Sequence, residues 1–358
     1  MNNFLTKKDL SLLAEQIKLW SSELGFSSIG ITDIDLSQDQ RYLEKWLEKD
    51  YHGEMKYMEK HGKKRSKPAE LVEGTKRIIS LSMNYLPVNY NGLELLKEDK
   101  KAFVSGYARG RDYHKIMRSR LKKLVSKIKV HSSHENRVFV DSAPVLEKAL
   151  AQKAGLGWIG KNTLLLNKNA GSYFFLGEIY TDLELPIDEP KIVNHCGSCT
   201  SCMDVCPTKA FEGPNQLDAR KCISYLTIEY KGSIKEELRP MMGNRIFGCD
   251  DCQIFCPWNK FLKITDEADF KPRHNLDDIE LSILFMWSEE EFLKKTQGSP
   301  IRRAGYESWL RNIAIALGNA QSSVEVLRVL HSKKDDPSEI VKEHVNWAIE
   351  QHKNKEKK

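Results

Sequence analysis

Eight cysteines, all between residues 196 and 256, constrain this chain of 358 residues more than any other feature of its sequence. The N-terminus from Met1 to Leu13 mixes charges and lacks the apolar segment of a secretory signal, so we expect a cytoplasmic protein. Structural disulfides are rare in that reducing compartment, so the cysteines are predicted to bind metal. No run of about 18 apolar residues is present, and no membrane span is predicted.

The spacing of the cysteines predicts two [4Fe–4S] clusters. The first four follow the pattern C-x2-C-x2-C-x3-C and precede Pro207, as in bacterial two-cluster ferredoxins. Three thiolates on a tight loop can cap three corners of one cubane, whereas the fourth, on the following helical turn, points to the other cluster. The second set also ends in C-x3-C-P, at Pro257. We assign Cys196, Cys199, Cys202 and Cys256 to cluster one, and Cys206, Cys222, Cys249 and Cys252 to cluster two.

Zinc is the alternative metal, because two C-x2-C pairs can form a four-cysteine site. The C-x3-C-P endings and the use of all eight cysteines in two quartets favour iron–sulfur clusters. Cys222 lies far upstream of Cys249, and the insert between them, Ile223 to Gly248, is predicted to contact a cofactor or substrate. His195 is interpreted as a neighbour of Cys196 and not as a ligand.

The segment before the cysteines alternates between helical and strand patterns, which predicts an α/β domain. Its predicted strands are 28–34, 77–84, 102–107 and 137–141, with a β-hairpin formed by 163–166 and 173–181. Its predicted helices include 10–24, 37–49, 112–127 and one that begins at Pro144.

The whole chain is predicted to be an α+β multidomain protein. Residues 1–188 would form the α/β domain, and 189–262 the ferredoxin-like domain with two clusters. From about residue 277 the pattern is helical, so 263–358 is predicted to be a HEAT-like helical region that packs on the rest.

Several motifs outside the cysteines point to one family. They are Tyr107 to His114, Asp141 to Glu147, Gly155 to Thr163, Arg311-Asn312 and Leu317 to Asn319. Together with both cysteine sets they resemble the epoxyqueuosine reductases, over about residues 5 to 320. The resemblance implies the last step of queuosine formation, in which an epoxide at the wobble position of tRNA is reduced to a cyclopentene. The tRNAs concerned read Tyr, His, Asn and Asp codons.

The same resemblance implies cobalamin in the α/β domain, with the clusters feeding electrons to cobalt while an acid protonates the epoxide oxygen. Asp141 is the candidate acid, at the end of a predicted strand. A helix N-terminus would lower its pKa, whereas burial against an apolar cofactor would raise it. The alternative is that Asp141 only caps the following helix.

Further residues are candidates for the cobalamin pocket. They are Arg65, Tyr107, Lys161, Asn162, Thr163, Ser224, Tyr225, Thr227, Asp250 and Asp251, together with Asp141. Asp112-Tyr-His114 nearly matches the D-x-H-x-x-G pattern of cobalt-ligating histidines, but Met117 replaces the glycine. His114 is therefore interpreted as lining the site or supporting it.

The partners implied by the resemblance are tRNA and an electron donor such as a flavodoxin or ferredoxin, with the chain itself a monomer. A formal net charge of +6 is compatible with a polyanionic partner, and phosphate contacts would make binding salt-dependent. Lys231, Arg302 and Arg303 are the candidate tRNA contacts.

Two other functions stay open at this point. One is a reductive-dehalogenase-like cobalamin enzyme that acts on a small molecule, although such enzymes usually carry an export signal. The other is a non-catalytic electron carrier with two clusters, which the large first domain disfavours.

Overall fold

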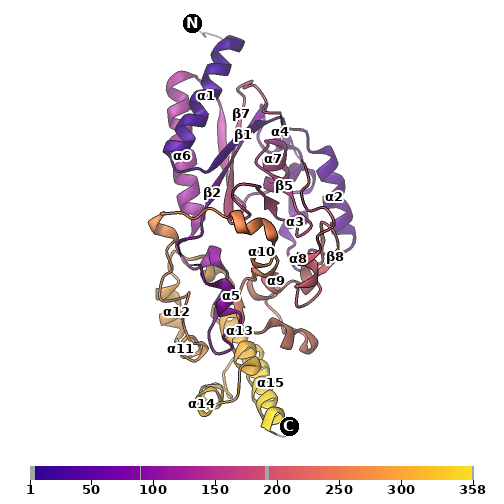
Figure 1. Cartoon of the computed structure of the whole chain (residues 1–358), viewed down its shortest axis with the longest axis vertical. Helices are drawn as coiled ribbons and strands as arrows, with labels where there is room; N and C mark the ends of the chain where they lie inside the picture. Colours follow the sequence, from indigo (N-terminus) through magenta and orange to yellow (C-terminus); the bar gives the residue numbers. More distant parts are fainter. Residues whose placement is uncertain (1–4, 89, 190–192, 357–358) are drawn as a thin grey trace.

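The computed structural model describes residues 5–88, 90–189 and 193–356. Its long axis runs from α1 (Lys7–Glu23) at one end to α15 (Glu339–Glu356) at the other, with the cysteine-bearing segments between them (Figure 1). The predicted α1 begins with a capping box, in which the Thr6 hydroxyl accepts from the Asp9 N–H and the Asp9 carboxylate accepts from the Thr6 N–H. In the described part of the chain, no helix has both the length and the apolar character to cross a membrane.

A four-stranded sheet forms the centre of the N-terminal half. Its order is β1 (Ser28–Thr32), β2 (Arg77–Asn84), β7 (Phe174–Thr181) and β4 (Asn136–Phe139). Every neighbouring pair is antiparallel, so this half is α+β, and the predicted α/β class is wrong for it. The alternation of helices and strands along the sequence does not fix strand direction, because strands far apart in the sequence pair here.

The predicted hairpin of residues 163–166 with 173–181 is also wrong. The short strand β6 (Leu165–Leu166) pairs with β5 (Trp158–Ile159), and β7 lies between β2 and β4. Only an isolated bridge joins Asn167 to Gly171. From Phe175 onward both faces of β7 are buried, which requires a central place in the sheet.

Helices cover both faces of the sheet. On one face α1 and α6 (Tyr113–His131) bury Ile17 and Leu121 against Ile179 of β7. On the other face Leu150 of α7 packs with Tyr180 of β7. The helix α7 spans Glu147–Lys153, so the predicted start at Pro144 is wrong, and the residues between β4 and α7 form turns.

Shorter elements connect these layers and carry the cysteines. Before the cysteines lie α2 (Ser37–Glu48), α3 (Tyr57–Lys60), α4 (Pro68–Leu71), α5 (Gly92–Leu95) and β3 (Phe103–Val104). The cysteine region contains α8 (Ser201–Asp204), β8 (Phe211–Gly213), β9 (Gln216–Leu217), α9 (Ile223–Ile228), β10 (Arg245–Phe247) and α10 (Asp251–Ile254).

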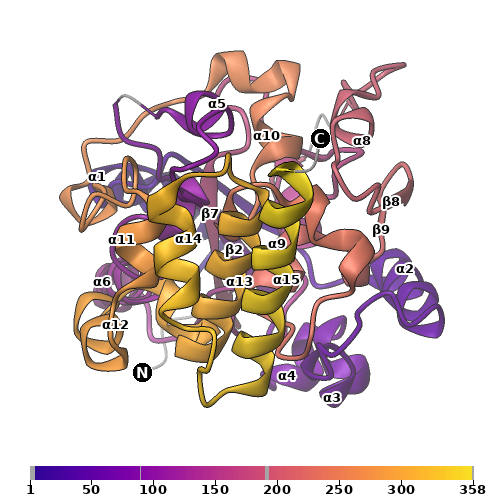
Figure 2. The same cartoon turned by 90° about the horizontal axis from the view of Figure 1, so that it is seen from below.

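The C-terminal region is helical, as predicted. It comprises α11 (Leu281–Phe285), α12 (Glu289–Lys295), α13 (Tyr306–Asn319), α14 (Val324–His331) and α15, and the last three lie together in Figure 2. This region does not have a separate core. Val104 and Phe247, from the parallel pair β3 and β10, belong to the same buried cluster as Trp309 of α13. The C-terminal helices therefore brace the segments that carry the second cysteine set.

Candidate active site

Two cavities divide the eight cysteines into quartets. The first cavity, about 210 Å³, is lined by Cys196, Cys199, Cys202 and Cys256. The second, about 490 Å³, is lined by Cys206, Cys222, Cys249 and Cys252. These are the two groups that the crossed spacing predicts. All eight cysteines lie within the described residues as free thiols, so both quartets have the donor chemistry that iron–sulfur clusters need.

The first cavity is close to the protein surface, and Cys199 is exposed. The indole Nε1 of Trp158 lies 3.5 Å from the Sγ of Cys196. The Lys161 ammonium donates to the carbonyls of Gly197 and Cys199, at 2.7 and 2.8 Å. Lys161 therefore supports the first cysteine loop, and it lines the first cavity and not the second.

The second cavity lies between the sheet and the second cysteine set. Its walls include aromatic rings, among them Tyr107 and Phe175, and polar groups that include Asn162, Thr163, Ser224, Asp250 and Asp251. Asn162 bridges to the cysteine segment, since its amide donates to the carbonyl of Cys252 at 3.1 Å. Thr163 has φ 65°, a left-handed conformation that is rare for a β-branched residue.

Two aspartates beside the second cysteine set have partners within the protein. Asp250 accepts from the Tyr90 hydroxyl at 2.7 Å and from the Gly106 N–H at 2.8 Å. Asp251 forms a bidentate ion pair with Arg245, at 2.5 and 2.7 Å. Both carboxylates therefore fix the backbone around Cys249 and Cys252 as well as facing the cavity.

The turn into Cys249 depends on a glycine. Gly248 has φ 73°, and a Cβ there would lie 2.5 Å from the Cβ of Ser105. Its N–H donates to the hydroxyl of Thr227 at 2.9 Å. Thr227 is thus a buried structural residue, and it does not line the cavity for which it was predicted.

The Arg311-Asn312 motif on α13 holds the insert between the cysteines. The buried Arg311 guanidinium donates to the carbonyls of Leu226, Tyr230 and Gly232, at 2.7 to 2.9 Å. The Asn312 amide donates to the carbonyls of Thr227 and Ile246, both at 2.9 Å. Burial lowers the pKa of Arg311 to about 10, which still leaves it charged at neutral pH.

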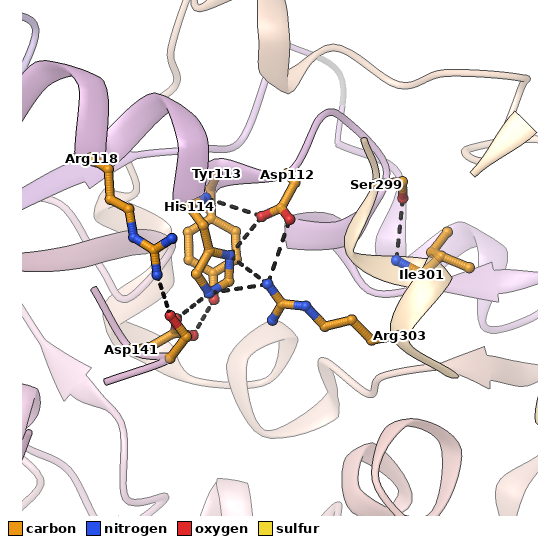
Figure 3. Close-up of polar contacts among 9 residues, drawn as sticks. Asp112, Tyr113, His114, Arg118, Asp141, Ser299, Ile301 and Arg303 are labelled. Atoms are coloured by element: carbon orange, nitrogen blue, oxygen red, sulfur yellow. Dashed lines mark hydrogen bonds and ion pairs between the residues drawn. The ribbon is translucent and has the colours of Figure 1, made fainter. Parts of the chain in front are cut away.

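Asp141 faces the second cavity and belongs to a polar network (Figure 3). Its Oδ1 lies 2.5 Å from Nε2 of His114, and its Oδ2 accepts from the Tyr113 hydroxyl. On the other side of the imidazole, Nδ1 lies 2.6 Å from Oδ1 of Asp112. Arg303 Nη2 completes the network, 3.5 Å from Asp112 Oδ2 and 2.9 Å from Nδ1 of His114.

The residue Asp141 is not a helix cap, because the N-cap of α7 is Leu146. Burial works to raise the pKa of Asp141, but the hydrogen bond and charge of His114 outweigh it and lower the pKa. Burial likewise works to lower the pKa of His114, yet its bonds to Asp112 and Asp141 raise it. Each group thus favours the charged form of the other, as the two partners of an ion pair do.

Sequence reasoning placed His114 near the site but missed its contact with Asp141. A signal was available, because Asp112 is the N-cap of α6 and so places His114 in its first turn. The contact also needs α6 to lie beside the loop after β4, which the sequence does not reveal.

Besides Lys161 and Thr227, two more residues predicted for the cobalamin pocket do not line the second cavity. Arg65 is buried and donates to the carbonyl of Tyr57 at 2.8 Å. The Tyr225 hydroxyl accepts from the Glu54 N–H at 2.8 Å. Both residues join the α3 segment to its surroundings.

The three residues predicted to contact tRNA differ in their exposure and in their hydrogen bonds within the protein. The Lys231 ammonium donates to the carbonyls of Ile228, Arg303 and Ala304 at 2.8 to 3.2 Å, so it braces the chain beside the cavity. Arg303 lines the cavity and contacts His114, although its side chain is 49 % exposed. Arg302 is exposed.

Comparisons with known proteins agree with this arrangement. A family model described as "4Fe-4S double cluster binding domain" matches residues 195–259, and one described as "Epoxyqueuosine reductase QueG, DUF1730" matches residues 65–142. The epoxyqueuosine reductase of Pseudomonas aeruginosa is 58 % identical over 349 residues, which cover 97 % of each chain. The cysteine region is therefore a double-cluster iron–sulfur domain, and the zinc alternative is set aside.

Solved structures of the same kind of enzyme share the fold. An epoxyqueuosine reductase crystallised with an epoxyqueuosine-modified tRNA-Tyr stem loop superposes with a TM-score of 0.87 at 29 % identity, covering 95 % of this chain and 90 % of that one. The Bacillus subtilis enzyme, described with its catalytic aspartate loop swung out of the active site, gives 0.86 at 28 %, with the same coverage. The near-complete match in sequence and fold shows that the chain belongs to the epoxyqueuosine reductase family.

Proposed function

We propose that this chain reduces epoxyqueuosine at the wobble position of tRNA to queuosine, with cobalamin in the second cavity and electrons delivered through the two clusters. One observation carries the proposal, which is that Asp141 and the four cysteines of the second set line the same cavity. A proton source and an electron source thus face one space, as the reduction of an epoxide requires.

The second cavity suits cobalamin by the chemistry of its walls. Its aromatic faces could pack on the corrin ring, while Asn162, Thr163 and Ser224 could bond the amides at the edge of the ring. Tyr107 would lie against the same ligand. Cobalamin, when bound, supplies the two-electron metal chemistry at the epoxide carbon.

The chain's own part in the chemistry is to hold and deliver protons. In our proposal the proton on His114 passes from Nε2 to the carboxylate of Asp141, 2.5 Å away, and from there to the epoxide oxygen. Asp112 keeps the imidazole oriented through Nδ1. The catalytic aspartate loop described for the Bacillus subtilis relative supports this role for Asp141.

The tRNA anticodon would approach the cavity from the side of Arg302 and Arg303. Arg303 joins that surface to the Asp112–His114 pair, so a bound phosphate there would also affect the active site. The relative bound to a tRNA stem loop supports this partner. Lys231 would act indirectly, by holding the backbone of Arg303 in place.

The remaining features are proposed to follow the family. The α+β half (1–188) would be the cobalamin domain, 189–262 the cluster domain and 263–358 a HEAT-like region. The protein would act as a cytoplasmic monomer, with a flavodoxin or ferredoxin as electron donor. Free thiolates survive best in such a reducing compartment.

Incubation of the anaerobically reconstituted chain with cobalamin, a reductant and epoxyqueuosine-containing tRNA tests the proposal. Mass spectrometry of the digested nucleosides should show conversion to queuosine. No conversion, with both clusters and cobalamin present, would reject the proposed function. Reduction of a halogenated small molecule under the same conditions, without any reaction of the tRNA, would favour the dehalogenase-like alternative.

A further inference from the structure

The further inference concerns where the electron donor binds, and it rests on the proposed function, which needs two electrons from outside the chain for each epoxide reduced. Cys199 of the first quartet is exposed, whereas the four cysteines of the second quartet are only partly exposed. The first cavity is therefore the place at which a donor can come close to a cluster. The chemistry of its rim indicates which kind of donor fits.

The rim of the first cavity is positively charged. All residues that line this cavity come from the segments 158–171, 193–203 and 252–265. The three segments contain no Asp or Glu, and their lysines are Lys161, Lys168, Lys260 and Lys263. Asp204, which follows the second segment, is exposed, and its carboxylate accepts from the Thr200 hydroxyl at 2.6 Å. The excess of positive charge favours a negatively charged partner.

Two of these lysines have charges that a partner can reach. Lys260 and Lys263 are exposed, and among the residues that the structure describes neither of them forms an ion pair. The Nζ of Lys260 lies 4.8 Å from the ring centroid of Phe261, a cation–π contact that keeps the lysine beside the cavity. A carboxylate of a partner would therefore not have to displace a carboxylate of this chain from either lysine.

Apolar side chains are exposed beside the same lysines. Phe261 lines the cavity and is 43 % exposed, and Ile264, three residues later, is 52 % exposed. Apolar groups among charged ones are typical of a protein-binding surface. Phosphates would use the lysines alone, and tRNA is proposed to approach the other cavity, so the combination favours a protein partner over a nucleic acid.

A series of aromatic contacts joins this rim to a cysteine of the first quartet. The ring centroids of Phe261 and Trp258 are 5.8 Å apart, and those of Trp258 and Trp158 are 5.1 Å apart. Trp158 in turn lies 3.5 Å from Cys196, measured from Nε1 to Sγ. A protein that packs on Phe261 would thus be separated from the first quartet only by closely packed side chains.

We propose that the rim of the first cavity binds a small acidic protein that carries single electrons near its surface. Lys260 and Lys263 would face acidic side chains of this carrier, while Phe261 and Ile264 pack on it. Each encounter passes one electron from the carrier, which is oxidised, to the first cluster, which is reduced, so two encounters serve one turnover. Such transient contacts bury less than about 1,200 Å², and opposite charges set how fast they form.

Stopped-flow mixing of the anaerobically reconstituted chain with reduced flavodoxin, an acidic one-electron carrier, tests this binding surface. The absorbance of the clusters reports their reduction without tRNA, so the measurement does not depend on turnover. The rim variant combines Lys260→Glu with Lys263→Glu. The control combines Lys122→Glu with Lys123→Glu, at exposed lysines of α6, and changes the net charge equally.

At low ionic strength the rate of cluster reduction should fall by about 10- to 100-fold in the rim variant, because electrostatic steering is lost. It should fall by less than about twofold in the control, and replacement of both rim lysines by Gln should give an intermediate loss. High salt should slow the wild type toward the rate of the rim variant. An unchanged rate in the rim variant, an equal loss in the control, or no reduction of the wild type would overturn the proposal.

A small chemical reductant, dithionite, separates electron delivery from the later steps. With dithionite the rim variant should keep its iron content and form queuosine at the wild-type rate. A raised KM for tRNA in that assay would identify the rim as a tRNA contact and overturn the proposal. Failure of the wild type to form queuosine with dithionite would reject the proposed function, while the stopped-flow rates would still decide where the carrier binds.

Discussion

The two cysteine quartets share a ligand chemistry but lie in different surroundings. In the first quartet Cys199 is exposed, and Phe261 on the wall of the same cavity is 43 % exposed. The second lines the larger cavity that also contains Asp141. The insert that carries part of the second quartet is braced from behind by the buried Arg311.

This difference indicates a direction for the electrons. An external donor can reach the first cluster, here called the outer one, at the exposed Cys199. The second cluster, here called the inner one, shares its cavity with Asp141 and can pass electrons to what that cavity binds. Cys206 and Cys256 are the crossed cysteines. Each follows the other cluster's cysteines closely in the sequence, so a short chain segment links the two cavities at each of them. The outer cluster is therefore expected to tolerate change better than the inner one.

Removal of a crossed cysteine ligand should have the largest effect on iron content and turnover. We expect Cys206→Ala to lose the inner cluster, about half of the bound iron, and all turnover, because Cys206 lines the inner cavity. Iron analysis and electron paramagnetic resonance after anaerobic reconstitution would measure this. The spectrum of Cys206→Ala should match that of Cys252→Ala and differ from that of Cys202→Ala. A match to Cys202→Ala would break the crossed assignment.

The second largest effect is expected from removal of the Asp141 carboxyl group. Asp141→Ala should keep both clusters and cobalamin, yet lose turnover by about 100- to 10,000-fold, the range for a general acid. The nucleoside assay measures the rate, and the visible spectrum reports the cofactors. Asp266→Asn, at an exposed carboxylate, is the control. A wild-type rate in Asp141→Ala would show that the inner cavity uses another acid.

Loss of the imidazole should have a smaller effect that depends on pH. The raised pKa of His114 means that its contribution to stability is complete below its ordinary value of 6.5 and is lost as the pH rises through the raised value. Asp141, whose pKa is lowered from 3.8, contributes above 3.8 and loses that contribution as the pH falls through the lowered value.

The difference in thermal unfolding temperature between the wild type and His114→Gln should therefore be largest between pH 3.8 and 6.5. The rate should fall by about tenfold, as expected when one hydrogen bond to a charged group is lost. A difference in unfolding temperature that does not change with pH would contradict the ion pair.

The smallest effect is expected at the outer loop. Lys161→Met removes two hydrogen bonds to the carbonyls around Cys199. We expect a chelator to remove the outer cluster about two to five times faster, with the inner cluster unaffected, because each such bond contributes modestly. Lys168→Met, at an exposed turn, is the control. Faster loss of the inner cluster would show that the two surroundings are not independent.

The sequence predicted what local spacing determines and missed what distant packing determines. The C-x2-C spacings and the C-x3-C-P endings predicted the two quartets that line the two cavities. The antiparallel sheet could not be predicted, because β7 pairs with strands far away in the sequence. The sequence could not reveal that Lys161 lines the first cavity while Asn162 and Thr163, its neighbours, line the second.

Diffraction at the iron absorption edge, from crystals of the anaerobically reconstituted chain, would test the account most directly. We expect two separate iron clusters. One should be bound by Cys196, Cys199, Cys202 and Cys256, and the other by Cys206, Cys222, Cys249 and Cys252, on the same cavity as Asp141. A single cluster, or Cys206 bound to the same cluster as Cys202, would contradict the division into an outer and an inner site.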